Sequence, residues 1–145
     1  MKLLIQRVSE ASVTVENSMV GRIGPGFLVL LGVDREDTVE IADRLLDKML
    51  NYRIFPDAEG KMNVSVKAMG GGVLLVSQFT LAADTRKGLR PSFSAAAPPQ
   101  TAERIYLYSL ERLKQEHGPI ASGVFGADMK VSLINDGPVT FLLEG

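Results

Sequence analysis

The chain has no cysteine and almost no histidine, and these two absences remove most of the familiar catalytic groups. Its 145 residues include no Cys and a single His. Without Cys there can be no disulfide, no thiolate nucleophile and no Cys-based zinc site. His117 precedes Gly118-Pro119 at the end of a helical pattern, where a cation interacts favourably with the helix dipole. This position favours a structural role for His117 over a role as catalytic base or metal ligand.

Long apolar runs are absent too. No stretch approaches the roughly eighteen apolar residues that a membrane-spanning helix needs, and charges at Lys2 and Arg7 come too early for a signal peptide. The net charge of −1 gives no general attraction to nucleic acid, so any such contact must use a local patch. We therefore expect one cytoplasmic domain, residues 1–145, that does not associate with membranes.

The chain is predicted to contain two helices, which are separated and flanked by strand-forming segments. A capping pattern, with Asp37 as the side-chain acceptor and Glu40 three residues later, predicts a helix that ends near Asn51. Pro98-Pro99 starts the second helix, which ends before Gly118. The expected inward residues are Ile41, Ala42, Leu45, Leu46 and Met49 in the first helix, and Ala102, Ile105, Tyr106, Ser109, Leu110 and Leu113 in the second.

Strands are expected before, between and after these helices. The predicted segments are 3–5, 11–15, 19–23, 27–31, 52–55, 62–66, 73–79, 121–125, 129–134 and 139–143. Residues 81–99 are expected to form a loop. This order predicts a single α+β domain, with a largely antiparallel or mixed sheet, or a barrel-like sheet, covered by two helices.

Two polar clusters at strand ends are the best candidates for chemistry. Ser77-Gln78-Phe79-Thr80 follows an apolar strand, and Asn135-Asp136-Gly137-Pro138-Val139-Thr140 leads into another. Hydroxyl, amide and backbone N–H groups can position a water and stabilise an oxyanion without a general base. Such a site would suffice for an activated ester but not for a peptide bond. For the second cluster a simple turn is the alternative, since Asp-Gly and Gly-Pro are strong turn signals.

A third candidate is the segment of residues 84–93. It carries the cations Arg86, Lys87 and Arg90 together with the aromatic Phe93. It is either a solvated surface loop or a contact to RNA phosphates and a stacked base. The sequence pattern leaves both interpretations open.

Six short segments, in order along the whole chain, carry a family resemblance. They are Gln6-Arg7-Val8 with Ala11-Ser12-Val13, Gly60-Lys61-Met62-Asn63, Ser77-Gln78-Phe79-Thr80-Leu81, Lys87-Gly88 with Arg90-Pro91-Ser92-Phe93, Gly126-Ala127-Asp128-Met129 and Asn135-Asp136-Gly137-Pro138-Val139-Thr140. Together they resemble the D-aminoacyl-tRNA deacylase family, whose length also agrees. Leu89 departs from the family pattern, in which a polar residue is common there, and this bears only on how the loop meets tRNA.

The resemblance implies a homodimeric hydrolase that removes D-amino acids, and mischarged glycine, from tRNA by cleaving the ester to the terminal adenosine. Ser77, Gln78, Phe79 and Thr80 would form the floor of the site, with backbone N–H groups near Phe79 and Thr80 facing the scissile carbonyl. No cofactor and no metal ion are implied.

Selection of the D-amino acid is likewise implied by the resemblance. Gly137-Pro138 would be the family's Gly-cisPro motif, which reaches into the site of the other subunit, and Arg7 would help to hold it. Backbone atoms of this motif would exclude every L side chain and admit D-aminoacyl and glycyl esters. Met129 and Phe125 are further candidate substrate-binding residues.

The absence of a general base fits an aminoacyl ester, because the neighbouring ribose hydroxyl can carry the proton. Thr80 could attack as a nucleophile or line the site, and lining is favoured because no activating base is in view. The competing hypothesis is a non-catalytic module that binds RNA or a nucleotide through the Arg86–Phe93 loop.

Overall fold

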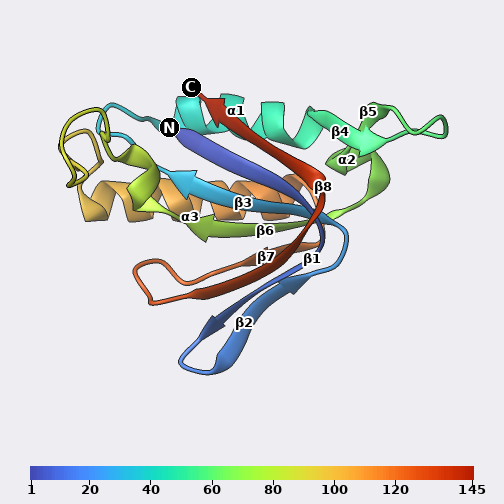
Figure 1. Ribbon diagram of the computed structural model, residues 1–145, viewed down its shortest axis with the longest axis horizontal. Coiled ribbons are helices and arrows are strands. Elements are labelled where there is room, and N and C mark those ends of the chain that lie inside the picture. Colours follow the sequence, from blue (N-terminus) through green and yellow to red (C-terminus); the bar gives the residue numbers. More distant parts are fainter.

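The computed structural model describes all residues, 1–145, as one α+β domain with a strongly curved sheet (Figure 1). The strands are β1 (Lys2–Val15), β2 (Ser18–Ile23), β3 (Gly26–Gly32), β4 (Arg53–Pro56), β5 (Met62–Ser65), β6 (Gly72–Ser77), β7 (Ile120–Ser122) and β8 (Lys130–Glu144). The helices are α1 (Val39–Asn51), α2 (Val66–Met69) and α3 (Pro99–Glu116), with a 3-10 helix η1 (Phe79–Ala82).

The sheet is mixed and nearly closes into a barrel. Its order is β2-β1-β3-β6-β7, with β8 also paired to β1. The β1 pairings are antiparallel, while β3–β6 and β6–β7 are parallel. The two outer strands, β2 and β7, approach closely at Gly21, where a Cβ atom would lie 2.7 Å from the carbonyl oxygen of Ser122. The missing side chain at Gly21 therefore lets the sheet curl round.

Two apolar clusters hold the fold together. The larger lies between the sheet and helices α1 and α3, and it contains Phe27, Leu46 and Tyr106. The smaller fills the inside of the curled part of the sheet, around Val13 and Leu74. Burying one such aliphatic or aromatic side chain contributes about 1.5–3 kcal/mol, so these two clusters stabilise the sheet and the helices that cover it.

Both predicted long helices are confirmed. All six predicted inward residues of α3 are buried. In α1, Ala42, Leu45, Leu46 and Met49 are buried as predicted, whereas Ile41 is half-buried and Leu50, which was not predicted, is buried. His117 is the C-cap of α3, and its Nε2 lies 2.6 Å from the carbonyl oxygen of Gly71.

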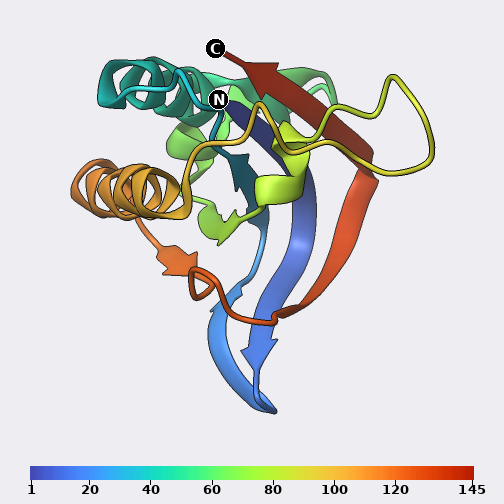
Figure 2. The same ribbon diagram turned by 90° about the vertical axis from the view of Figure 1, so that its left-hand side faces the viewer.

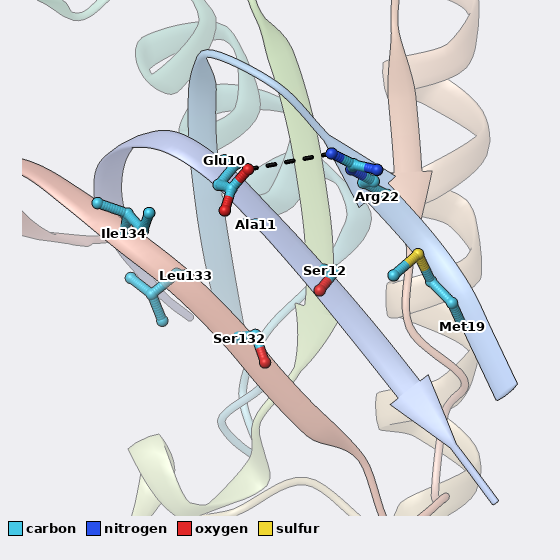
Figure 3. Close-up of a pocket in the computed structure, with 8 residues that line it drawn as sticks. All are labelled: Glu10, Ala11, Ser12, Met19, Arg22, Ser132, Leu133 and Ile134. Atoms are coloured by element: carbon cyan, nitrogen blue, oxygen red, sulfur yellow. Dashed lines mark ion pairs between the residues drawn. The ribbon is translucent and has the colours of Figure 1, made fainter. Parts of the chain in front are cut away.

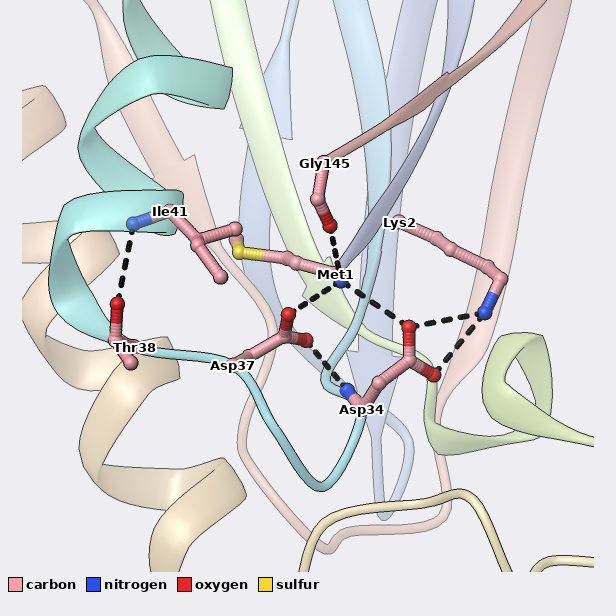
Figure 4. A network of polar contacts seen from close by, with 7 residues as sticks. All are labelled: Met1, Lys2, Asp34, Asp37, Thr38, Ile41 and Gly145. Carbon is pink, nitrogen blue, oxygen red and sulfur yellow. Dashed lines mark hydrogen bonds and ion pairs between the residues drawn. The ribbon is translucent and has the colours of Figure 1, made fainter.

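The predicted N-cap of α1 was wrong. The cap is Thr38, whose Oγ1 accepts a hydrogen bond from the Ile41 N–H. The Asp37 carboxylate instead accepts from the α-ammonium of Met1 at 2.6 Å and from the Asp34 N–H at 2.6 Å (Figure 4). Asp37 therefore neutralises a nearby cation instead of capping the helix.

The same polar network joins the start of β1 to the loop before α1 and to the end of β8. The Met1 ammonium donates to the carbonyl oxygen of Gly145 at 2.9 Å, and Lys2 Nζ pairs with Asp34 at 3.0 Å (Figure 4). Burial alone would raise the pKa of Asp34, but hydrogen bonds from Lys2 and the ammonium outweigh it and lower that pKa.

Several strand predictions needed correction. The segments 3–5 and 11–15 are parts of one continuous strand, β1, and the segments 129–134 and 139–143 are both parts of β8. Polar residues interrupt each pattern because they lie on an exposed face or in a bulge of an unbroken strand. β6 ends at Ser77 instead of Phe79, and β7 covers only Ile120–Ser122 instead of 121–125.

The prediction of two helices missed the short α2. Its signals are local: the Ser65 hydroxyl accepts from the Ala68 N–H at 3.1 Å, and Gly70 ends the helix with a φ of 68°. Four residues are too few to show helical periodicity in the sequence. None of the helices is long and apolar enough to cross a membrane.

Candidate active site

A cavity of about 480 Å³ opens at the carboxyl end of β6, beside η1 and the start of α3. Three of the four predicted floor residues, Ser77, Gln78 and Phe79, line it. Phe125 and Met129, the two further candidates, line it as well. The other lining residues are Val76, Ala96, Ala97, Pro99, Ala102, Gly126, Ala127, Asp128 and Val131.

The floor is held in place by the neighbouring strand β3. The Gln78 N–H donates to the carbonyl oxygen of Leu31 at 2.8 Å, which ties the chain leaving β6 to the end of β3. A Cβ atom at Gly32 would lie 2.8 Å from Leu81 Cβ, so this glycine lets η1 pack against β3. The first N–H groups of η1, at Phe79 and Thr80, have no partner within that helix.

Thr80 sits next to the cavity and is not one of its lining residues. Its Oγ1 accepts a short hydrogen bond from Gln78 Nε2, and this is its one side-chain hydrogen bond. The one carboxylate in the cavity wall, Asp128, is paired with Lys130 at 3.2 Å. The site thus offers hydroxyl, amide and backbone groups, and no base lies within hydrogen-bonding distance of the Thr80 hydroxyl.

An aromatic pair links the cavity to the loop of residues 84–93. Phe79 is 62% exposed and packs against Phe93, with ring centroids 5.1 Å apart and planes tilted by 47°. The loop is closed at its base, where Asp84 and Ser92 exchange two backbone hydrogen bonds of 2.7 and 3.0 Å. The structure therefore brings Phe93 to the rim of the predicted site.

The cations of this loop differ in their surroundings. Arg86 lies 2.7 Å from the Asp84 carboxylate, and this hydrogen bond holds the pKa of Asp84 well below its usual range. Lys87 and Arg90 are exposed and form no ion pair. Leu89, which differs from the polar residue common at this position in the family, is fully exposed. Lys87 and Arg90 are therefore the two loop cations free to meet an anion.

The second predicted cluster lies elsewhere. The Gly137-Pro138 peptide is cis, and Gly137 has a φ of 148°. A Cβ atom at Gly137 would lie 2.5 Å from Val139 Cγ2, so only glycine fits. Arg7 contacts this turn, since its Nε donates to the carbonyl oxygen of Asp136 at 2.9 Å. None of residues 135–140 lines the cavity of the same chain.

The sequence analysis missed the small residues that shape the cavity. Ala96 and Ala97 precede the first turn of α3 and form part of the wall with Ala102. Only Ala102 had a signal, its place on the inward face of a helix. A short run of alanines before a proline has no periodicity that would indicate a pocket.

A smaller hollow of about 240 Å³ lies on the outer face of β1, β2 and β8 (Figure 3). Glu10 and Arg22 face each other across it at 4.0 Å, and Met19 and Ile134 border it. It holds none of the predicted catalytic residues. In addition, no group of three or more His, Asp or Glu side chains is placed to hold a metal ion.

The fold and the cavity define a small α+β protein whose site is built from hydroxyl, amide and backbone groups. The family model described as D-Tyr-tRNA(Tyr) deacylase matches residues 4–144. The chain therefore belongs to the D-aminoacyl-tRNA deacylase family, a family of hydrolases, and the predicted resemblance is confirmed.

Individual relatives agree over almost their whole length. A D-aminoacyl-tRNA deacylase of Pseudomonas fluorescens (strain Pf0-1) is 62% identical over 144 residues, covering 99% of each chain. One of Saccharophagus degradans is 59% identical over 143 residues, again covering 99% of each.

Two solved structures are similar to this one. One, described as c-Myc DNA Unwinding Element Binding Protein, is 44% identical with a TM-score of 0.95, and covers 100% of this chain and 99% of that one. The other, a probable eukaryotic D-amino acid tRNA deacylase, is 18% identical with a TM-score of 0.75 over 98% and 97% of the chains. At 18% identity, the similarity to the second structure supports a shared fold only.

Proposed function

We propose that this protein hydrolyses the ester between a D-amino acid, or mischarged glycine, and the terminal adenosine of tRNA, and so acts as a proofreading enzyme in the cytoplasm. The observation that carries the proposal is the position of Ser77-Gln78-Phe79 on the floor of a cavity in a chain of this family. The products are the free amino acid and tRNA.

Catalysis rests on orientation and charge stabilisation. The N–H groups of Phe79 and Thr80 stabilise the oxyanion that forms on the ester carbonyl, and one such donor is worth about 2.7–4 kcal/mol. The neighbouring ribose hydroxyl carries the proton, and Thr80 lies beside the cavity with its hydroxyl held by Gln78. No metal ion takes part in this scheme.

The active form is a homodimer in which Gly137-Pro138 of each subunit enters the cavity of the other. Two features support this. Pro138 is exposed and lies outside the cavity of its own chain. On the sheet, Leu4 stands opposite both Leu30 and Leu142, so the three share one face, and Leu142 is 49% exposed. A self-complementary apolar face of this kind suits a two-fold dimer.

Chiral selection follows from this arrangement. Rigid backbone atoms at Gly137-Pro138 occupy the space into which any L side chain must project, whatever its chemistry. A D-aminoacyl or glycyl ester places only a hydrogen there and is admitted. Arg7 fixes the turn through the carbonyl oxygen of Asp136.

The tRNA is held outside the cavity. Lys87 and Arg90 contact phosphates, and Phe93 offers a ring for base stacking beside Phe79. Arg86 contributes less than the other two cations, because Asp84 already neutralises it.

The test is the release of D-tyrosine from D-tyrosyl-tRNA by the purified protein, dialysed and assayed with EDTA. We expect hydrolysis well above the rate without protein, and full activity with the chelator. Electrophoresis of the same samples checks that the tRNA itself stays intact. An ester that survives incubation with the protein contradicts the proposal.

A non-catalytic nucleic-acid-binding module is the second candidate. It is favoured by the description of the 44% identical structure as a DNA-binding protein and by the exposed cations of the loop. The same assay separates the two, because a binding module would bind the tRNA and leave the ester intact.

A further inference from the structure

The pairing of β1 with β8 is irregular beside Arg7. Gln6 stands opposite Thr140, but Val8 stands opposite Asn135. Two steps along β1 are therefore matched by five along β8, three more than in a regular antiparallel ladder. The extra residues include Gly137-Pro138, whose peptide is cis. Figure 2 shows that β8, drawn in red, bends sharply along its length.

The side chain of Asn135 spans the turn at Gly137-Pro138, and both its amide oxygen and its amide nitrogen form hydrogen bonds. Asn135 Oδ1 accepts a hydrogen bond from the Val139 N–H at 2.9 Å, and Asn135 Nδ2 donates to Thr140 Oγ1 at 2.9 Å. Val139 is buried, so its N–H needs an acceptor. Gln6 Nε2 also donates to Thr140 Oγ1, at 3.3 Å, which joins the bridge to β1.

The turn is thus held from two sides. Arg7 holds the residue before Gly137 through the Asp136 carbonyl oxygen at 2.9 Å. Asn135 holds the two residues after Pro138, Val139 and Thr140. Arg7 and Asn135 are thus two side chains that hydrogen-bond to the backbone on either side of Gly137-Pro138.

We propose that Asn135 is a positioning residue for chiral selection, which fixes the Gly137-Pro138 turn by bridging the Val139 N–H and the Thr140 hydroxyl. This inference rests on the proposed function, because it assigns Asn135 to the discrimination between D- and L-esters. An amide suits the task, since one planar group supplies both the acceptor and the donor. Loss of the bridge leaves the Val139 N–H without an acceptor and frees the turn to move out of the space of an L side chain.

The test compares kcat/KM for D- and L-tyrosyl-tRNA in four variants. Asn135→Ala removes both hydrogen bonds of the Asn135 amide, and Asn135→Asp keeps the acceptor for the Val139 N–H. Thr140→Val removes the hydrogen bond between Asn135 Nδ2 and the Thr140 hydroxyl. Ser132→Ala, at an exposed position on the same strand, is the matched control. We expect the D/L ratio to fall roughly tenfold or more in Asn135→Ala, and to stay within about threefold of wild type in Asn135→Asp and in the control.

If Asn135 had only a structural role, its loss would lower kcat/KM for D- and L-tyrosyl-tRNA by the same factor. Equal losses for the D- and L-esters in Asn135→Ala, or an unchanged ratio, therefore overturn the inference. If Asn135→Ala does not fold, Thr140→Val takes its place, with a smaller fall of the ratio expected and an unchanged ratio counting against the inference.

Hydrogen exchange of the Val139 amide, followed by NMR, reports the bridge without any substrate. We expect exchange about tenfold faster in Asn135→Ala than in Ser132→Ala, with the amide of Leu143 unaffected. If the wild-type protein hydrolyses neither ester, the proposed function fails, and this measurement alone decides whether Asn135 fixes the turn. Equal exchange of the Val139 amide in Asn135→Ala and Ser132→Ala contradicts a role of Asn135 in fixing the turn.

Discussion

Phe79 and Thr80 show how few chemical groups the proposed reaction needs. Phe79 contributes a backbone N–H at the start of η1, and its ring meets Phe93 at the rim of the cavity. Thr80 has a hydroxyl already bound by Gln78 and no base to activate it. In the proposed reaction these residues only position an ester that is reactive by itself.

Thr80→Ala tests whether the Thr80 hydroxyl, which lies beside the cavity, acts as a nucleophile. We expect turnover of D-tyrosyl-tRNA to fall roughly ten- to a thousandfold, equivalent to about 1.4–4 kcal/mol, and not to vanish. Single-turnover kinetics measure this, with Thr14→Ala on β1 as the control. An acyl-enzyme adduct on Thr80, detected by mass spectrometry, would show that it is a nucleophile instead.

Individual site residues were predictable only in part. The place of Ser77 and Gln78 at a strand end was visible in the sequence, because an apolar run stops there. The packing of Phe79 on Phe93 was not, since nothing local indicates a contact between two residues fourteen positions apart. The bridge at Asn135 also escaped notice, because an Asn before Asp-Gly-Pro looks like any other turn residue.

Among the secondary-structure elements, the buried faces of the two long helices were predicted best. The inward face of α3 followed from helical periodicity alone, and each of those side chains is buried. Short elements such as α2 and η1 have too few residues to show a period, and the cap of α1 depended on a tertiary contact. Asp37 and Thr38 both qualify as caps, and the cation near Asp37 decides between them.

Asp34 joins β1 to the loop before α1, and its contribution depends on pH. Its pKa is lowered in the folded protein from about 3.9 in the unfolded chain, so its stabilisation is present above about pH 4 and is lost as the pH falls through the folded pKa. We expect Asp34→Asn to lower the free energy of unfolding by roughly 1 kcal/mol at pH 7, a value discounted for partial exposure.

Urea denaturation at several pH values measures this difference, which should shrink below about pH 4. Asp128→Asn is the control, because the Asp128–Lys130 pair is almost fully exposed and contributes little. A loss of stability in Asp34→Asn that stays constant down to pH 2 would contradict the assignment.

At the scale of the whole molecule, the cavity and the Gly137-Pro138 turn are separate features of one chain. The sequence indicated α+β and a mixed sheet, but not its near closure. That closure depends on the approach of β2 to β7 at Gly21, over about a hundred residues of sequence, for which no local pattern exists. The homodimer stays a prediction, and in such a dimer the polar clusters Ser77–Thr80 and Asn135–Thr140 would meet across the interface although they lie apart in one chain.

Leu142→Glu tests the dimer, because it places a charge on the apolar face shared by Leu4 and Leu30. We expect wild-type protein to sediment at about twice the monomer mass of 15.7 kDa at micromolar concentration, and the variant to shift toward the monomer and lose activity. Leu107→Glu is the matched control, since Leu107 is equally exposed but lies on α3. A fully active wild-type monomer would refute the shared site.

The most direct measurement is the hydrolysis of D-tyrosyl-, L-tyrosyl- and glycyl-tRNA by the same preparation of wild-type protein. The account predicts that the D-tyrosyl and glycyl esters are cleaved, and that the L-tyrosyl ester is cleaved slower by roughly a hundredfold or more, because its side chain meets the backbone at Gly137-Pro138. Equal hydrolysis of the D- and L-tyrosyl esters would contradict it.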